Sequence, residues 1–164
     1  MKLLDHIDIA RKIKRMAIQI LEQNYQEPEI ILAGINKNGT AFAELLFNEF
    51  TKKFEQKLTL TTITLNPANP LTVPIEVGLP IEYFENKVII VVDDVANTGR
   101  TIFYAIKPFL DIIPKKIEVA VLVDRKHKSF PIMVDYMGMS LATTLQENIE
   151  VSLKDKNEYS VMLN

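Results

Sequence analysis

The chain has 164 residues, a formal net charge of −2 and no cysteine. A chain of this length buries roughly two thirds of its unfolded surface, so we expect one domain over residues 1–164, and the missing cysteines exclude disulfides and thiolate metal sites. The charge argues against a protein that coats nucleic acid, the acidic N-terminus M-K-L-L-D-H-I-D argues against a secretory signal, and no stretch reaches the about 18 uncharged residues of a membrane span, so we expect a cytoplasmic protein.

The first half of the chain alternates amphipathic helices with apolar strands. Apolar side chains recur at helical spacing in residues 9–23 and again in residues 40–54, which predicts a helix over each range. The apolar run at residues 29–34 and the run rich in Thr, Leu and Ile at residues 58–65 predict strands. Prolines are frequent from there to residue 80, and we expect a long loop in that segment.

The second half of the chain continues the alternation. Residues 88–92 and 117–123 are apolar, β-branched runs typical of buried strands. Residues 99–110 predict a helix that Pro108 ends early. Continuous apolar strands that alternate with helices indicate an α/β fold with a mainly parallel central sheet, and such sheets bind ligands at the carboxyl ends of their strands.

Two adjacent acids follow the most apolar of these strands. In V-I-I-V-V-D-D-V-A-N-T-G-R-T (residues 88–101), Asp93 and Asp94 lie at the carboxyl end of the predicted strand, where a ligand would bind. Adjacent carboxylates repel each other and lose hydration beside an apolar strand, so they need a cation or hydroxyl groups nearby. A metal ion or a sugar diol would satisfy them, whereas the alternative interpretation is a solvated strand end.

A turn of small residues comes directly after the acids. It precedes the N-terminus of the next predicted helix, where free N–H groups and the helix dipole attract anions. Gly99 lets the backbone approach a ligand closely, and the hydroxyls of Thr98 and Thr101 can donate hydrogen bonds. The turn therefore predicts a phosphate site beside the sugar site, built from Ala96, Asn97, Thr98, Gly99 and Thr101.

The full string resembles the phosphoribosyl-pyrophosphate (PRPP) binding motif of type I phosphoribosyltransferases. Three further segments resemble, in the same order, the branch that combines attenuation of pyrimidine operons with uracil phosphoribosyltransferase activity. They are I-L-A-G-I-N-K-N-G (residues 31–39), V-A-V-L-V-D-R-K-H-K-S-F-P-I (residues 119–132) and V-D-Y-M-G (residues 134–138). The resemblance implies a central sheet flanked by helices, with a small hood formed by the chain ends over the base.

The resemblance also implies an activity, which is Mg²⁺-dependent transfer of ribose 5-phosphate from PRPP to a nucleobase, uracil in this branch. A homo-oligomer, dimer or higher, is implied as well. Asp93 and Asp94 are then the catalytic pair, in contact with the ribose hydroxyls directly or through Mg²⁺. The implied pyrophosphate loop consists of Asn36, Lys37, Asn38 and Gly39. The implied nucleotide site consists of Val95, Ala96, Asn97, Thr98, Gly99, Arg100 and Thr101, joined by Arg125.

Departures from the family pattern leave competing hypotheses. Asn97 stands where purine enzymes carry an acid and the pyrimidine branch an aromatic residue, so it disfavours a 6-oxopurine more than a pyrimidine, or else it serves only the turn. Asn38 replaces the usual arginine of the pyrophosphate loop, and Lys37 lacks its bidentate fork. Residues 58–79 hold no Lys or Arg and only Glu76 as a charge. The chain is therefore either a competent enzyme or a nucleotide-binding protein with weakened catalysis.

A second class of function is nucleotide-sensing, RNA-binding regulation of pyrimidine genes. A basic helix face could contact RNA phosphates, or it could be a solvated surface, which we favour. Met133 and Met139 replace basic residues of the regulators, and we expect them to pack in a core or a subunit contact. We therefore expect no nucleotide-dependent RNA binding, and we assign no role to His6. The basic face comprises Arg11, Lys12, Lys14 and Arg15.

Overall fold

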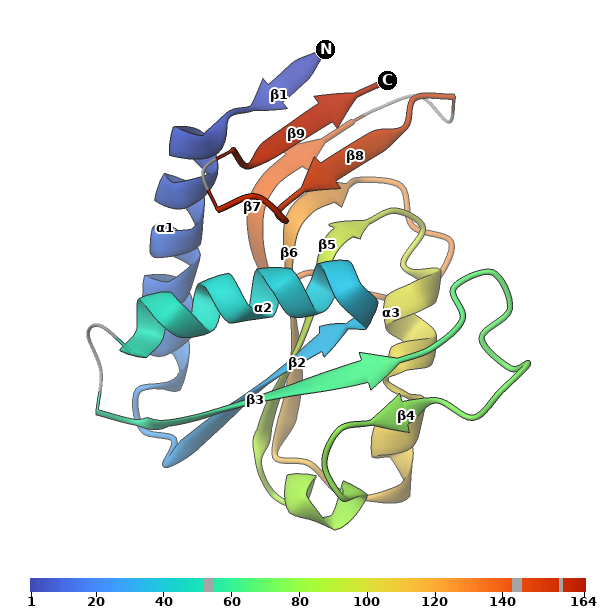
Figure 1. The fold of residues 1–164 in the computed structure, drawn as a ribbon. Helices are drawn as coiled ribbons and strands as arrows, with labels where there is room; N and C mark the ends of the chain where they lie inside the picture. Colours follow the sequence, from blue (N-terminus) through green and yellow to red (C-terminus); the bar gives the residue numbers. More distant parts are fainter. Residues whose placement is uncertain (52–54, 143–145, 157) are drawn as a thin grey trace.

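The main sheet has the strand order β4-β3-β2-β5-β6-β7. Neighbouring strands pair in parallel except β4, which is antiparallel to β3 at the sheet edge. The computed structural model describes residues 1–51, 55–142, 146–156 and 158–164, and Figure 1 shows the sheet running through the middle of the molecule. The predicted α/β fold with a mainly parallel sheet is confirmed. The strands are β2 (Glu29–Ile35), β3 (Lys57–Thr64), β4 (Glu76–Val77), β5 (Val88–Ala96), β6 (Lys116–Arg125) and β7 (Tyr136–Leu141).

Helical elements cover both faces of this sheet, as Figure 1 shows. In β2, Ile30 and Leu32 pack with α1 and α2, whereas Ile31 and Ala33 pack on the opposite face with α3, η1 and η2. Successive side chains of a strand point to opposite faces, so a sheet buried on both sides needs continuous apolar strands. No helix in the described part of the chain is long and apolar enough to cross a membrane. The helical elements are α1 (His6–Asn24), α2 (Asn36–Thr51), α3 (Arg100–Ala105) and the 3-10 helices η1 (Ile81–Phe84) and η2 (Lys107–Asp111).

The two ends of the chain form a small second sheet, the hood. Its strand order is β1-β9-β8 and both pairs are antiparallel, with β1 at Lys2–Leu4, β8 at Ile149–Ser152 and β9 at Ser160–Leu163. Figure 1 shows the hood above the upper ends of β5, β6 and β7. These upper ends are carboxyl ends, so the hood covers the sheet edge where ligands are expected.

His6 helps to hold the hood, so our expectation that it has no role was wrong. Its Nδ1 accepts a hydrogen bond from the backbone N–H of Tyr159 at 3.3 Å. The two rings also pack together, with centroids 4.6 Å apart. His6 therefore joins the first turn of α1 to the segment that leads into β9.

Two helices begin earlier than their apolar spacing predicts. α1 begins at His6 because Asp5 caps it: Asp5 Oδ1 accepts from the N–H of Asp8 at 2.9 Å, and the Asp8 side chain reaches back to the N–H of Asp5. α2 begins at Asn36 instead of residue 40, so the predicted polar turn forms the first helical turn. The predicted end of that helix beyond residue 51 lies outside the described residues.

The end of β5 and the length of α3 bear directly on the site. β5 continues to Ala96, beyond the predicted end at residue 92, because pairing with β6 persists to the match of Ala96 with Asp124. The two acids therefore lie within the strand. α3 ends at Ala105, so the helix ends early, as predicted. The chain continues as the short helix η2, which contains Pro108.

Part of the basic face of α1 is hydrogen-bonded to the protein. Lys12 Nζ and Arg15 Nη2 each donate to the carbonyl oxygen of Gly138 in β7 at 3.0 Å. Arg11 and Lys14 are exposed. The favoured interpretation of a solvated face is therefore correct for Arg11 and Lys14, whereas Lys12 and the still exposed Arg15 also fasten α1 to the edge strand.

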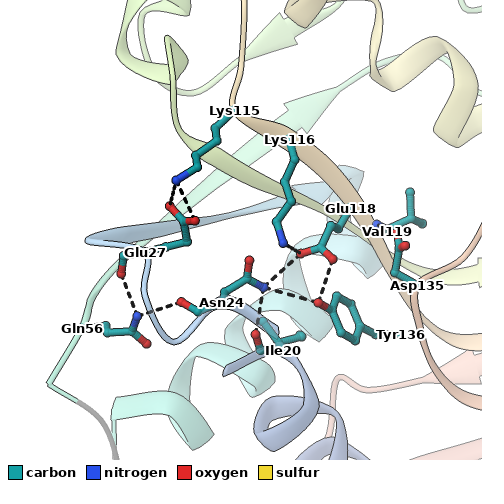
Figure 2. Close-up of polar contacts among 10 residues, drawn as sticks. All are labelled: Ile20, Asn24, Glu27, Gln56, Lys115, Lys116, Glu118, Val119, Asp135 and Tyr136. Carbon is teal, nitrogen blue, oxygen red and sulfur yellow. Dashed lines mark hydrogen bonds and ion pairs between the residues drawn. The ribbon is translucent and has the colours of Figure 1, made fainter. Parts of the chain in front are cut away.

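A buried polar cluster, shown in Figure 2, fastens the end of α1 to β6 and β7 at the sheet edge opposite the hood. Asn24 Nδ2 donates to Ile20 O at 2.8 Å, to Glu118 Oε1 at 3.0 Å and to Tyr136 Oη at 3.4 Å. The Tyr136 hydroxyl donates to Glu118 Oε2 at 2.9 Å, and Lys116 pairs with the same carboxylate at 3.4 Å. Burial and the neighbouring Glu118 carboxylate raise the pKa of Tyr136, so the phenol stays neutral.

A second polar cluster lies at the amino end of β2. The Glu29 carboxylate accepts hydrogen bonds from the hydroxyls of Thr59 and Tyr83 and pairs with Lys87 at 3.2 Å. Burial acts to raise the pKa of Glu29, but these donors outweigh it and hold the pKa below its ordinary value of 4.5. A carboxylate with a lowered pKa stabilises the fold above the pKa of the unfolded chain, and the contribution is lost as the pH falls through the folded value.

We expect Glu29→Gln to lower the free energy of unfolding by about 1–3 kcal/mol at pH 7, because the donors around the site lose a charged acceptor. The variant should also lose part of the wild-type decline in stability below pH 4.5. Urea unfolding at pH 7 and at several pH values below 5 measures both effects. Glu82→Gln, on the exposed surface of η1, is the matched control, and equal stabilities for the two variants would contradict the prediction.

Candidate active site

A cavity of about 1000 Å³ opens at the carboxyl ends of β2, β3 and β5, and one residue of the hood contributes to it. The first turn of α2 forms one wall, and the end of β5 forms another. The structure therefore brings together most of the residues that the sequence predicts, although they come from separate parts of the chain. The predicted residues that line the cavity are Asn36, Lys37, Asn38, Asp93, Asp94, Val95, Asn97 and Thr101.

The two acids differ in environment. Asp93 is 9% exposed, and its Oδ1 accepts from the N–H of Asp94 at 2.9 Å. Burial, followed by the adjacent Asp94, raises the pKa of Asp93 well above its ordinary value. Asp94 is less buried, and it accepts from the N–H of Val95 at 2.9 Å and from Asn38 Nδ2 at 3.0 Å. Asp94 is therefore the more accessible acid, and Asp93 is the buried acid behind it.

The first turn of α2 is pressed against the end of β5. Asn36 adopts a positive φ of 51°, and its Oδ1 accepts from the N–H of Leu65, which ties the helix start to the end of β3. A Cβ atom on Gly39 would lie 2.5 Å from the carbonyl oxygen of Val92, so no larger residue fits without a backbone shift. The first N–H groups of a helix have no partner within the helix. This arrangement presents them, with Lys37 and Asn38, beside the acids.

The turn after β5 encloses a cradle of about 40 Å³, lined by residues 95–102. Gly99 has a φ of 84°, which a residue with a side chain adopts only with strain. The carbonyl oxygen of Thr98 accepts from the N–H groups of Ser129 and Phe130, so the loop after β6 holds the turn in place. Because α3 has only six residues, its dipole is small and the amides of the turn are the main anion-binding feature.

The side chain of Arg100 does not point into the cradle. Its backbone lines the cradle, but its Nη2 donates to the carbonyl oxygen of Ala68 at 3.1 Å. The motif therefore places the Arg100 backbone at the site, while the side chain ties α3 to the proline-rich segment.

Arg125 lies at the end of β6 beside the turn. Its side chain is buried, and its Nη1 donates to Asn97 Oδ1 at 3.2 Å. Lys128 follows in the same loop, bonded to Asp124 at 2.6 Å, and its Cδ lies next to Gly99. The basic segment after β6 therefore adjoins the predicted phosphate cradle.

Several residues of the cavity were missed from the sequence. Thr62 and Thr64 lie at the carboxyl end of β3, and Glu44 lies on α2. The rule that ligands meet the carboxyl ends of parallel strands could have found the two threonines. Ile149, from the hood strand β8, carries no local signal, because its place depends on how the chain ends pair.

The fold and the cavity together define a class of protein. A mainly parallel sheet under a hood, two acids at the end of a central strand and a Thr-Gly turn beside them are the parts expected of a phosphoribosyltransferase. Residues 2–156 match the phosphoribosyl transferase domain family. The chain belongs to this family, as its motifs indicate.

Relatives support the same assignment. The chain is 36% identical over 164 residues to the Bifunctional protein PyrR of Clostridium acetobutylicum, covering 96% of this chain and 92% of that protein. It is 30% identical over 167 residues to the protein of the same name from Streptomyces coelicolor, covering 98% of this chain and 86% of that one. A solved hypoxanthine phosphoribosyltransferase of Trypanosoma cruzi aligns with a TM-score of 0.77 at 16% identity, covering 98% of this chain and 94% of that one. The predicted type I phosphoribosyltransferase fold is confirmed.

We expect Gly39→Ala to lower the free energy of unfolding by about 1–3 kcal/mol, because its Cβ would collide with the backbone of β5. Gly78→Ala is the comparison, since its Cβ meets first the hydroxyl of Thr61, a side chain that can rotate. Chemical denaturation of both variants tests the difference. Equal losses of unfolding free energy in the two variants would contradict the prediction that the close contact between α2 and β5 excludes a larger residue at position 39.

Proposed function

We propose that this protein transfers ribose 5-phosphate from PRPP to uracil, releasing UMP and pyrophosphate, with Mg²⁺ as its cofactor. The observation that carries the proposal is the shared cavity, in which the acid pair lies between the turn at residues 96–101 and the first turn of α2. The likeness of residues 119–138 to the pyrimidine branch supports uracil over a purine.

Each part of PRPP has a matching set of groups. The turn at residues 96–101 offers backbone amides and the hydroxyls of Thr98 and Thr101 to the 5′-phosphate. Asp94, backed by Asp93, accepts hydrogen bonds from the ribose hydroxyls. The first turn of α2, with Lys37, faces the pyrophosphate. The substrate is thereby fixed at both ends, which leaves C1′ of the ribose between them.

The chemistry then depends on charge. As the bond between C1′ and the pyrophosphate oxygen breaks, positive charge builds on the sugar and negative charge builds on the leaving group. A nitrogen of the base donates its electron pair to C1′ as the bond to the pyrophosphate oxygen breaks, and the N–H proton of the base passes to water or to the departing pyrophosphate. The Asp94 carboxylate stabilises the positive sugar, the α2 amides and Lys37 stabilise the leaving group, and positioning supplies the remainder.

The donor set fits Mg²⁺. This ion takes hard oxygen ligands and is commonly bound by one or two carboxylates together with substrate phosphates and water. The described residues contain no group of three or more His, Cys, Asp or Glu that could hold a metal ion by themselves. Asp94 and Asp93 would therefore hold the ion only together with PRPP, and the bound ion would offset negative charge on the pyrophosphate.

We expect the protein to release pyrophosphate from PRPP and Mg²⁺ with uracil, and not with hypoxanthine, guanine or adenine. Asp94→Asn should reduce kcat/KM by about 100-fold, because it removes a charge that acts on the transition state. Asp111→Asn, at the exposed end of η2, should leave the rate unchanged. Release of pyrophosphate with a purine would contradict the assignment of uracil as the base. Binding of UMP without release would favour the alternative, a nucleotide-binding protein with weakened catalysis.

The structure adds an argument against nucleotide-dependent RNA binding. Lys12 and Arg15 each use a donor on the Gly138 carbonyl, so the basic face offers RNA phosphates fewer free donors than the sequence suggests. Met139 packs against the core, as expected. Met133 is 75% exposed, so a subunit contact is the one of its two predicted roles that is left.

We therefore expect no gel shift of a pyrimidine-operon leader RNA at physiological salt, with or without UMP. Lys14→Glu should leave this result unchanged. A shift that UMP strengthens, and that Lys14→Glu abolishes, would establish the regulatory function and overturn the prediction.

A further inference from the structure

We propose that Arg125 and Asn97 form a specificity pair that selects uracil over cytosine by the carbonyl oxygen that uracil carries in place of cytosine's amino group, with Asn97 as the hydrogen-bond donor and Arg125 as the residue that orients it. The proposal rests on the proposed function, since it assigns the base-recognition groups of the same cavity. It concerns a position where this chain carries neither the acid nor the aromatic residue of the resembled enzymes.

Strand register brings the pair together. β5 and β6 run in parallel, and their last matched residues are Ala96 and Asp124. Asn97 directly follows β5 and Arg125 is the last residue of β6, so they lie side by side at the sheet edge. Arg125 is 8% exposed, and its Nη1 lies 3.2 Å from Asn97 Oδ1.

This contact determines which end of the Asn97 amide faces the cavity. A guanidinium has only donors, so the amide oxygen must point toward Arg125 and the NH₂ group must point away. Asn97 is exposed and lines both the main cavity and the phosphate cradle. Its Nδ2 has no protein partner among the residues that the structure describes. The cavity is therefore presented with a donor at this position.

The surroundings suit the edge of a planar ring. Val95 from β5 and Ile149 from the hood line the same cavity as Asn97. A base lying against these apolar side chains would keep its ring faces dry and turn a polar edge toward Asn97. The alternative, in which Asn97 serves only the turn, accounts for the bond from Arg125 to its oxygen but gives no role to the Nδ2 donor.

The donor discriminates by chemistry. A carbonyl oxygen on the base accepts the Asn97 N–H, whereas an amino group at the same place brings two donors together and leaves both unpaired. The pair should therefore favour uracil over cytosine, which differ by an exchange of oxygen for an amino group. A loss of one such hydrogen bond corresponds to about tenfold in affinity.

Calorimetric binding of UMP, CMP and ribose 5-phosphate in the presence of Mg²⁺ tests the proposal. Wild type should bind UMP about tenfold more tightly than CMP. Asn97→Asp replaces the donor by an acceptor while keeping the bond from Arg125, so it should remove or reverse the preference. Ribose 5-phosphate, which has no base, measures what the added negative charge beside the cradle costs phosphate binding, and the ratio of UMP to CMP affinity is free of that cost because both nucleotides carry the same phosphate.

Two variants of Arg125 separate orientation from a structural role. Arg125→Leu frees the amide to rotate and should bring the ratio of UMP to CMP affinity close to one, and Arg125→Lys, which retains a donor and a charge, should restore part of the preference. Gln19→Glu is the matched control, since it makes the same amide-to-carboxylate change on the exposed face of α1 and should leave the ratio unchanged. If Arg125→Leu does not fold, Asn97→Asp alone decides.

The outcomes distinguish the two proposals. Binding of ribose 5-phosphate together with an unchanged ratio in Asn97→Asp would overturn the specificity pair and leave the proposed function intact. Failure of wild type to bind ribose 5-phosphate or either nucleotide would overturn the proposed function, and the specificity pair with it.

Discussion

The site depends on two neighbouring carboxyl groups, one buried and one partly exposed, at the end of an apolar strand. Taking a carboxylate out of water is costly, and a second one beside it adds repulsion. The structure offsets this cost with backbone N–H donors: Asp93 accepts from Asp94 N, and Asp94 accepts from Val95 N. The raised pKa of Asp93 indicates that the compensation is incomplete. A sugar diol or a cation would complete it, so the end of β5 is prepared for a ligand at some expense of stability.

The rest of the fold keeps this strand end in place. Polar anchors at the opposite sheet edge, around Asn24 and Glu29, fix the amino ends of the strands without using any group of the cavity. At the carboxyl edge, Gly39 allows α2 to lie directly on β5. The chain ends then pair as the hood and bring Ile149 over the cavity. The two polar anchors lie at one edge of the sheet, and the binding groups lie at the other.

The sequence predicts the parts of this fold that follow from local pattern. The sequence reveals β2, β5 and β6 as continuous apolar runs because each of these strands is buried on both faces. It reveals α1 by the spacing of its apolar side chains because this helix is buried on one face. The hood could not be predicted strand by strand, since β8 and β9 each have four residues and pair through contacts between distant segments. For the site, the motif gives positions and not side-chain directions. Asn97 and Thr101 line the cavity, whereas the Arg100 side chain turns away to Ala68. No sequence motif indicates that Ile149 lines the cavity.

The balance of charge in the cavity bears on whether the protein is a competent enzyme or a nucleotide-binding protein with weakened catalysis. Among the described residues that line it, Glu44, Asp93 and Asp94 are acidic and Lys37 alone is basic. An anion as highly charged as PRPP therefore meets a cavity that repels it, unless a divalent cation enters with it. Asn38 stands where the resembled enzymes carry a cation, and its amide is engaged by Asp94. Ground-state binding of a nucleotide, which has no pyrophosphate, suffers least from this shortage of positive charge. Stabilisation of a departing pyrophosphate suffers most. The same cavity can thus bind its product well and catalyse slowly, and the difference between an enzyme and a nucleotide-binding protein comes down to how much negative charge the first turn of α2 can stabilise.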